Sequence, residues 1–407
     1  MTDVSVETVD TASLPKFPGS RPARCPFDPP PEHAQWREQP GLQQATWNGC
    51  PVWVVSRHAD ARMMMTDPRV SAEIRGKLLM AAYEGVEEIP PIFPRMDGAE
   101  HQRRRRMLND EFTAPRARAM RPEIERLANE FLDRMIEKGQ PADLVRDYAM
   151  PVPSLVISLL LGVPYSDHEF FQEHSATGFR LDATPDEQMD SNIALFGYMM
   201  ELIERKEREP GDDLISRLIQ QYVIPGELDK EALAMNGIIL LNAGHETTAN
   251  MISLGVLALL QNPDALARIR DTNDPKQIAA AMHELLRYLS IVQGHVVRMA
   301  KEDMVIGGQQ VRAGDGLLLN IPGSNRDPAR FTDPDTLDLD RDTSAHLAFG
   351  FGPHLCIGQT LARVELEVAF TSLLRRLPTL RLAVPIEEIK FRNNMATYGV
   401  FELPVAW

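Results

Sequence analysis

The chain has 407 residues, enough for one large domain or for two or three smaller ones, and for a sizeable buried core. Hydrophobic residues make up 43% and charged residues 25% of it, a balance that excludes disordered, collagen-like and coiled-coil chains. The formal net charge of −15 excludes a nucleic-acid-binding protein with a broadly basic face. The three cysteines form no C-x-x-C pair, so neither a disulfide framework nor a zinc site is expected, and a reducing cytoplasm fits best.

The N-terminal region has no basic segment followed by an apolar one, so we expect neither a secretory signal nor a membrane anchor there. Residues 1–24 are expected to form an extended tail, and residues 25–407 a single domain. The most apolar long stretch, residues 237–260, is interrupted by four polar side chains, among them Glu246. Such a helix is costly to place in lipid, so no segment is expected to span a membrane.

The periodicity of apolar residues predicts a mainly α fold with a small β-rich lobe. An early hairpin is predicted at residues 46–56, and a final helix at residues 357–376. Apolar positions three or four apart predict helices over residues 98–112, 122–138, 190–208, 213–222 and 229–261. Short strands separated by turns are predicted at residues 304–306, 310–312 and 317–321. The irregular segments 72–100 and 177–187 are expected to be loops that could cover a site, in an open or a closed state.

The sequence HLAFGFGPHLCIG, residues 346–358, is the sharpest chemical signal in the chain. Its glycines allow a tight turn and a close approach of the backbone to another group. Cys356 stands at the entrance of a predicted helix, where exposed N–H groups favour a thiolate, the form that binds metals. A dinucleotide-binding G-x-G-x-x-G is not present, because the third glycine position holds Leu355. Cys25 and Cys50 lack such a frame and are interpreted as buried or surface thiols.

A second signal lies in the middle of the helix predicted at residues 229–261. At 1.5 Å per residue this helix is about 50 Å long, enough to cross the whole molecule. Its central AGHETT places a glycine, an acid and hydroxyls among apolar residues. Thr247 can donate its hydroxyl to the carbonyl of Ala243 and open the helix locally, which predicts a polar notch on an apolar wall. A solvated stripe on a surface helix is the alternative interpretation.

Two further patterns are weak when taken alone. Glu284 and Arg287, in HELLR, share one helical face and can form an ion pair, whereas a zinc protease would need a second histidine in the place of the arginine. The run DGAEHQRRRR puts His101 and Arg105 on one face, and its other arginines are typical of a solvated basic surface.

Together these four motifs resemble those of the cytochrome P-450 family of haem-thiolate monooxygenases, and the resemblance covers residues 25 to 407. It implies the P-450 fold, with a long central helix crossing the molecule over haem b, and makes residues 25–407 the catalytic domain. Cys356 would be the proximal iron ligand, because a cysteine thiolate ligates the haem iron in this family. Phe349 would pack beside the sulfur, and Gly350, Ala243 and Gly244 would contact the cofactor.

The resemblance also assigns residues to protons and propionates. Glu246 would be the acid that feeds protons, and Thr247 the hydroxyl that steadies dioxygen. His245 occupies a variable position, where it could tune Glu246, line the pocket or, as we favour, point to solvent. The resemblance matches four residues to haem propionate contacts: His101, Arg105, Arg298 and His354. Glu284 and Arg287 would join Arg341 in a structural cluster that braces the cysteine loop.

The resemblance is strongest to soluble actinomycete members, many of which hydroxylate macrolides, steroids or other bulky natural products. It implies an apolar small-molecule substrate, O2, and electrons from NAD(P)H through a separate ferredoxin and ferredoxin reductase. A monomer without nucleic-acid or membrane partners is expected. Arg103, Arg104 and Arg106 are candidates for docking the acidic electron donor. Residues that neighbour the motifs are expected to form the pocket wall: Leu241, Ala243, Thr248, the segment from Val292 to Val296, and the segment from Tyr398 to Phe401.

Two other functions stay open on the same scaffold. One is nitric-oxide reduction or peroxide-driven oxidation, although peroxide-using members tend to have lost the acid–threonine pair that is intact here at Glu246 and Thr247. The other is a haem sensor or carrier without turnover.

Overall fold

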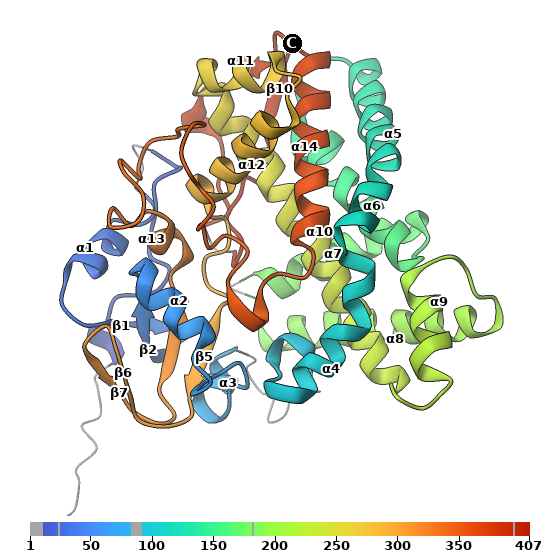
Figure 1. The fold of residues 1–407 in the computed structure, drawn as a ribbon. Helices are drawn as coiled ribbons and strands as arrows, with labels where there is room; N and C mark the ends of the chain where they lie inside the picture. Colours follow the sequence, from blue (N-terminus) through green and yellow to red (C-terminus); the bar gives the residue numbers. More distant parts are fainter. Residues whose placement is uncertain (1–10, 23–24, 83–91, 181–182, 394) are drawn as a thin grey trace, which may run out of the picture.

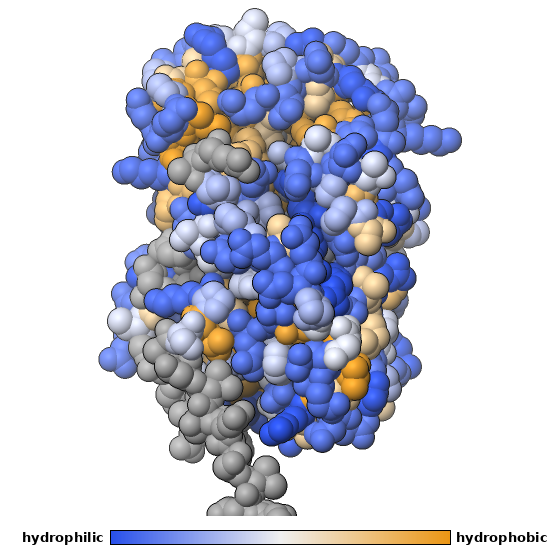
Figure 2. All heavy atoms as spheres, turned by 90° about the vertical axis from the view of Figure 1, so that its left-hand side faces the viewer, coloured by the Kyte–Doolittle hydropathy of each residue, from blue (hydrophilic) through white to orange (hydrophobic). Residues whose placement is uncertain are grey.

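The computed structural model describes residues 11–22, 25–82, 92–180, 183–393 and 395–407. Long helices form most of the molecule, and a smaller lobe contains the largest sheet together with short helices (Figure 1). The face that Figure 2 shows is mainly hydrophilic, with small apolar patches between the polar side chains. The expected fold class, mainly α with a small β-rich lobe, is confirmed.

Fourteen α-helices are found in the described residues: α1 (Glu32–Glu38), α2 (His58–Thr66), α3 (Gly76–Ala82), α4 (Gly98–Asn109), α5 (Ala114–Lys138), α6 (Pro151–Leu161), α7 (His168–Phe179), α8 (Pro185–Arg208), α9 (Leu214–Leu218), α10 (Lys230–Leu260), α11 (Pro263–Asp271), α12 (Pro275–Leu289), α13 (Ile321–Asn325) and α14 (Gln359–Arg376). Short 3-10 segments are η1 (Thr11–Ser13), η2 (Phe93–Arg95), η3 (Asp110–Phe112), η5 (Tyr165–Asp167), η7 (Gly352–His354) and η8 (Ile386–Glu388). Two π-helical turns are η4 (Val145–Ala149) and η6 (Ile219–Val223).

Helix α10 is the central strut of the helical body, flanked by α6, α8 and α14 (Figure 1). The Asp229 side chain caps its N-terminus by accepting a hydrogen bond from the Ala232 N–H at 2.6 Å. Most of its residues are buried, so its stability comes from packing on several sides. Glycines permit the closest contacts: a Cβ at Gly255 would lie 2.5 Å from the Phe370 ring of α14.

The largest sheet has the strand order β1-β2-β8-β5-β3. It consists of β1 (Gln43–Trp47), β2 (Cys50–Val55), β8 (Gly316–Leu319), β5 (Val297–Ala300) and β3 (Val70–Ser71), with β2 and β8 parallel and the other pairs antiparallel. Asn48 and Gly49 join β1 to β2 with positive φ angles of 47° and 76°, which suit a two-residue hairpin turn. The predicted hairpin at residues 46–56 is therefore present, starting three residues earlier.

Two small sheets complete the fold. One has the order β4-β10-β9 and joins β4 (Ala142–Asp143), β10 (Pro404–Ala406) and β9 (Arg381–Leu382). The other is a hairpin of β6 (Met304–Ile306) and β7 (Gln309–Val311), as its glycine-containing turn predicts. In the described residues, no helix is both long and apolar enough to cross a bilayer.

The described part of the expected N-terminal tail packs on the body of the protein. Lys16 bridges to Thr46, next to strand β1, and Phe17 is buried and stacks on His33 and Trp36. The chain from residue 15 to 22 is thus extended but packed, because its aromatic and arginine side chains find partners in the body. Residues 1–10 and 23–24 of the proposed tail lie outside the described residues.

Other boundaries differ for local reasons. Helix α5 begins at Ala114 instead of residue 122, since Pro122 is accommodated inside it. The helix expected at 213–222 ends at Leu218 and continues as the π turn η6. The two expected loops are partly helical: α3 and η2 occupy part of 72–100, whose residues 83–91 lie outside the described chain. A capping box of Thr184 and Glu187 starts α8 within segment 177–187.

Candidate active site

The Cys356 loop is shaped by its glycines and by backbone hydrogen bonds. Gly350 and Gly352 have φ angles of 74° and 72°, which side chains other than glycine rarely adopt. A Cβ at Gly352 would lie 2.8 Å from the Met65 carbonyl oxygen of α2, so only glycine lets the loop approach that helix. The Cys356 N–H donates to the Phe349 carbonyl at 2.9 Å, directly before α14 begins.

The pKa of the Cys356 thiol differs in direction from the lowered pKa expected for a cysteine at a helix entrance. Burial raises the pKa of the thiol, while the Gly358 and Gln359 N–H groups and Arg105 lower it without prevailing. The helix end alone therefore does not deprotonate the sulfur, and a metal would have to displace the proton.

Cys356 is nevertheless exposed, although burial dominates its pKa. The two observations agree if the sulfur faces a hollow inside the protein. Ala243 likewise has exposed surface inside the protein body, since it lies in the middle of α10 and most of that helix is buried. His295, which the sequence did not single out, has exposed surface too, yet burial lowers its pKa to about 4.

The notch in α10 has the predicted hydrogen bond. The Thr247 hydroxyl donates to the Ala243 carbonyl at 2.7 Å. The preferred orientation of His245 is wrong: its side chain is buried, and its Nδ1 lies 2.8 Å from the Leu241 carbonyl. A Cβ at Gly244 would lie 2.8 Å from Ile157 of α6, so this glycine permits the close packing of two helices. Its expected contact with the cofactor stays a prediction.

Glu246 is buried and paired through one of its carboxylate oxygens. Its Oε1 forms an ion pair with Arg392 from the C-terminal segment and accepts a hydrogen bond from Asn250 Nδ2 at 3.1 Å. Asn250 Nδ2 also lies 3.2 Å from Thr397 Oγ1, and Arg392 Nε donates to the Val400 carbonyl at 3.0 Å. No sequence pattern indicated Arg392, because it lies 146 residues from Glu246 in a short segment without periodicity.

The four expected propionate contacts lie close together. His101 and His354 stack with ring centroids 4.1 Å apart, and Arg105 donates to the Leu355 carbonyl. Arg298 contributes to the electrostatic surroundings of both histidines. His101 Nε2 is buried without a hydrogen-bond partner. A buried polar atom of this kind indicates a site for a group with hydrogen-bonding capacity.

The structure adds Arg95 to this cluster. Its Nη1 donates to the Val297 carbonyl at 3.2 Å, and Arg298 Nη1 donates to the same oxygen at 2.9 Å. Burial and the nearby charge of Arg95 lower the pKa of Arg298 to about 10. Two guanidinium groups that share one carbonyl repel each other, which favours an anion beside them. Nothing in the pattern FPRMD, which contains Arg95, distinguishes it from a surface arginine.

The charges of the cluster do not cancel among the described residues. Asp97 is its acid, and lies 3.8 Å from His354 Nε2. Burial lowers the pKa of His354, and lowers that of His101 to about 4, so both imidazoles are neutral at pH 7. Arg95, Arg105 and Arg298 bring three positive charges, and the charge of Lys301 also acts on Asp97, so the cations exceed the one carboxylate. This excess of positive charge favours the two negative charges of the haem propionates.

The acid–arginine cluster is assembled as expected. Arg287 Nε and Nη2 donate to the two Glu284 oxygens at 2.7 and 2.8 Å, and both side chains are completely buried. Arg341 Nε lies 3.3 Å from Glu284 Oε1. Arg287 Nη1 donates to the Asn325 and Pro334 carbonyls at 2.9 and 2.8 Å, which ties α12 to the chain that leads to the cysteine loop.

The candidate docking arginines of α4 are not equivalent. Arg103 and Arg104 both pair with Glu100 at 2.8 Å, and the Arg104 side chain is only 12% exposed. Arg106 is exposed. The ion pairs reduce the positive charge that this face presents.

Several expected pocket residues are packed in the core. Leu241, Thr248 and Tyr398 are at most 5% exposed, and the Tyr398 hydroxyl donates to the Pro26 carbonyl at 2.9 Å. The prediction that these three residues line the pocket is therefore wrong, because protein atoms already cover their side chains. Val292 and Val296 remain partly exposed.

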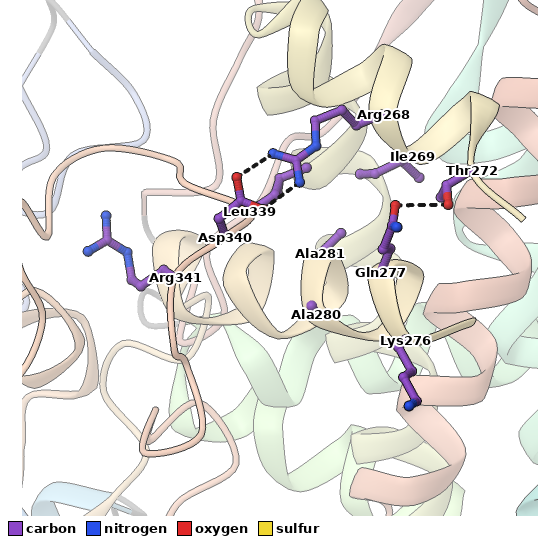
Figure 3. Close-up of a pocket in the computed structure, with 10 residues that line it drawn as sticks. All are labelled: Arg268, Ile269, Thr272, Lys276, Gln277, Ala280, Ala281, Leu339, Asp340 and Arg341. Carbon is purple, nitrogen blue, oxygen red and sulfur yellow. Dashed lines mark hydrogen bonds and ion pairs between the residues drawn. The ribbon is translucent and has the colours of Figure 1, made fainter. Parts of the chain in front are cut away.

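A separate surface pocket of about 270 Å³ lies between α11, α12 and residues 339–341 (Figure 3). Arg268 crosses its edge to pair with Asp340 at 2.7 Å. Of its lining residues, only Arg341 belongs to the clusters described above, through Glu284, so we do not assign the candidate active site to this pocket.

The fold and the cysteine loop define a haem-thiolate class of enzyme, and comparisons with known proteins agree. The family model for cytochrome P-450 matches residues 46–381. The chain is 49% identical to cytochrome P-450-SU2 of Streptomyces griseolus, over 96% of each chain. It is 44% identical to the vitamin D3 dihydroxylase of the same species, over 100% of each.

Among solved structures, the chain resembles the mycinamicin VIII hydroxylase MycCI of Micromonospora griseorubida, whose crystal contains mycinamicin VIII. The TM-score is 0.89 at 36% identity, over 97% of this chain and 100% of that one. The chain belongs to the cytochrome P-450 family. It is a monooxygenase of that family and thus an oxidoreductase, and the family implies haem iron as its cofactor.

Proposed function

We propose that the protein inserts one oxygen atom from O2 into a bulky apolar small molecule, most often as a hydroxyl group. Electrons would come from NAD(P)H through a separate ferredoxin and ferredoxin reductase in the cytoplasm. The observation that carries this proposal is an exposed Cys356 whose thiol pKa is nevertheless raised by burial, combined with an acid and a threonine on the buried helix α10.

The residues present fit haem b. Cys356 would ligate the iron, while Arg95, Arg105 and Arg298 would hold the propionates and His101 Nε2 would gain a partner. Phe349 contributes through its carbonyl, which fixes the Cys356 N–H, and its ring lies 5.1 Å from the Arg363 guanidinium. When bound, haem supplies the oxidising chemistry, with the thiolate as electron donor to the iron.

The side chains of α10 would handle protons. Thr247 can rotate its hydroxyl between the Ala243 carbonyl and a group in the hollow, so it can hold or pass a proton at Oγ1. Glu246 lies one residue away but is buried behind Arg392, which keeps its carboxylate paired. A proton from solvent would reach Thr247 through Glu246 only if the carboxylate loosens its contact with Arg392. The intact Glu246–Thr247 pair favours dioxygen chemistry over a peroxygenase or a sensor.

The substrate is proposed from the relatives and the wall of the hollow. The similar proteins include a vitamin D3 dihydroxylase and a mycinamicin hydroxylase. We infer a substrate of that general kind, a macrolide, steroid, terpenoid or polyketide, held against Ala243, Val292 and Val296 with water excluded. His295 would place one polar group in this apolar wall.

The acidic electron donor would dock near α4, with Arg106 as the least neutralised of its three arginines. A basic surface on a chain of net charge −15 orients such a partner through its field.

The test is the coupling of electron use to product in the haem-loaded enzyme, with a substrate found by a spectral binding screen of apolar natural products. Thr247→Ala should divert most electrons to peroxide. Ser253→Ala is the matched control, because its hydroxyl makes the same i−4 bond, to Ala249 at 2.9 Å, in a fully buried turn of α10. Equal coupling in Thr247→Ala and the wild type would contradict the proton-handling role.

A further inference from the structure

Two histidines that the proposed function does not use connect α12 to the cysteine loop. His283 directly precedes Glu284 on α12, and His346 directly precedes the loop that leads to Cys356. His283 Nδ1 lies 3.0 Å from His346 Nε2, in a partly buried contact between residues 63 positions apart. For this contact to be a hydrogen bond, one of the two nitrogens must carry a proton and donate it to the other.

The surrounding backbone fixes these tautomers. The Ala348 N–H donates to His346 Nδ1 at 3.2 Å, so Nδ1 carries no proton. A neutral His346 therefore has its proton on Nε2 and donates it to His283 Nδ1. His283 must then carry its own proton on Nε2.

The environment keeps this arrangement neutral. Burial lowers the pKa of His346 to about 3, and the charges of Arg363 and Arg287 act in the same direction. Burial and Arg363 also lower the pKa of His283. A protonated His346 would present an N–H to the Ala348 N–H and would face two arginines, so the neutral pair is the stable state near pH 7.

A series of hydrogen bonds, joined by the backbone of residues 346–350, connects the histidine pair to Cys356. His346 holds the Ala348 amide, and the Gly350 N–H donates to the Leu347 carbonyl at 2.9 Å in the same turn. This turn presents the Phe349 carbonyl, which accepts the Cys356 N–H at 2.9 Å. On its other side, the Leu347 N–H donates to Asn325 Oδ1 at 2.7 Å. The turn is thus held from two elements.

We propose that the His283–His346 pair is a positioning element, which orients the Cys356 sulfur by fixing the turn of residues 347–350 from helix α12. This inference rests on the proposed function, in which Cys356 ligates haem iron. His283 does not touch the sulfur and acts through His346, the Ala348 amide and the Phe349 carbonyl. The acid–arginine cluster on the same helix reaches the turn by another route, because Arg287 donates to the Asn325 carbonyl and Asn325 Oδ1 accepts the Leu347 N–H.

The experiment compares two substitutions of His283 in the haem-loaded protein. His283→Asn places an amide oxygen near the position of Nδ1 and keeps an acceptor for His346. His283→Leu has a similar size but leaves the His346 Nε2–H buried without an acceptor, which is the costlier change. The readouts are the rate at which the reduced, carbon monoxide-bound protein loses its thiolate-type Soret band in mild denaturant, and the reduction potential.

We expect His283→Leu to lose the thiolate band about tenfold faster than the wild type and to have a shifted potential, and His283→Asn to resemble the wild type. His346→Gln keeps a donor near Nε2 but removes the acceptor of the Ala348 amide, so it should behave like His283→Leu and serves if that variant does not load haem. His33→Gln, in a buried site that contacts Pro18, controls for loss of an imidazole elsewhere.

Equal rates for His283→Leu, His283→Asn and the wild type would overturn the inference and leave the proposed function standing. Equally impaired Leu and Asn variants would also overturn it, because the acceptor would then not be the property that matters. A wild-type protein without any thiolate band would instead overturn the proposed function, and this inference with it.

Discussion

Two buried charged clusters of the protein follow opposite rules. On α10, Glu246 meets one arginine and one amide, so its charge is compensated inside the protein. In the cluster around His101 and His354, Arg95 and Arg298 donate to the Val297 carbonyl, Arg105 donates to the Leu355 carbonyl, and Asp97 is the nearby carboxylate.

The comparison distinguishes a cluster whose charge is balanced by protein groups from one whose positive charge favours the binding of an anion. A compensated carboxylate is stable without a ligand, and its partner can regulate it. Uncompensated cations in a protein interior raise the free energy of the empty site, and a dianionic cofactor removes that cost. The predictions below test this contrast, beginning with the largest expected effect.

The first prediction concerns the compensated cluster. Arg392→Leu should lower the free energy of unfolding by about 3 kcal/mol, because Glu246 would be left buried without its cation; the partial exposure of Arg392 keeps the effect at the low end of the usual range. The measurement is urea denaturation followed by circular dichroism. The double variant Glu246→Gln/Arg392→Leu should recover much of the loss, and a double variant less stable than the single one would show that the carboxylate was not the origin of the cost.

The second prediction concerns the cation cluster. Arg95→Gln and Arg298→Gln should each speed haem transfer to apomyoglobin about tenfold, since each removes a charge-assisted contact worth about 1.5 kcal/mol. Arg75→Gln is the matched control, because Arg75 pairs with Glu73 and its side chain is 75% exposed. With the dimethyl ester of haem, which has no propionate charge, Arg95→Gln and the wild type should release the cofactor equally fast. A persistent difference with the ester would assign Arg95 a purely structural role.

The third prediction concerns pH. Burial lowers the pKa of His33 to about 3, while its Nε2–H donates to the Pro18 carbonyl at 2.9 Å. The unfolded chain binds a proton at His33 near pH 6.5, and the folded chain does not. The contribution of neutral His33 to the free energy of unfolding is therefore present above pH 6.5 and is lost as the pH falls toward 3. Between pH 7 and 5.5 the loss is about 1 kcal/mol. His33→Gln keeps a donor for Pro18 without titrating there, so its stability should fall less in this window; an identical slope would refute the assignment.

The fourth and smallest prediction concerns the docking surface. Glu100 neutralises part of the charge of Arg103 and Arg104, so Glu100→Gln should speed reduction by an acidic ferredoxin roughly twofold at low salt and less at high salt. Arg106→Gln should slow it. Stopped-flow reduction at two ionic strengths measures both, and rates without salt dependence would show that this face is not used.

The sequence predicted those parts of the site that depend on local pattern. The glycine frame of Cys356, the Thr247–Ala243 hydrogen bond and the Glu284–Arg287 pair all arise within a few residues along the chain, and the structure contains them as expected. The long helix was predictable too, because its 31 residues contain no proline and lie between Pro225 and Pro263.

The sequence did not predict the partners that long-range folding supplies. Arg392 reaches Glu246 from a segment without periodicity, and Arg95 meets Arg298 only because η2 lies against β5. The expectation that His245 points to solvent is wrong, because an imidazole that bonds its own helix at the Leu241 carbonyl can be buried. Helix direction likewise could not decide that Gly244 packs against Ile157.

The most direct test of the central claim is the absorption spectrum of the reduced protein under carbon monoxide, recorded for the wild type, Cys356→Ser and Cys50→Ser. Cys50 is half-buried, and its thiol hydrogen bond is to the Pro51 carbonyl. We predict the thiolate-type Soret band in the wild type and in Cys50→Ser, and its complete loss in Cys356→Ser. A Cys356→Ser protein that kept the band would contradict the assignment of Cys356 as the iron ligand.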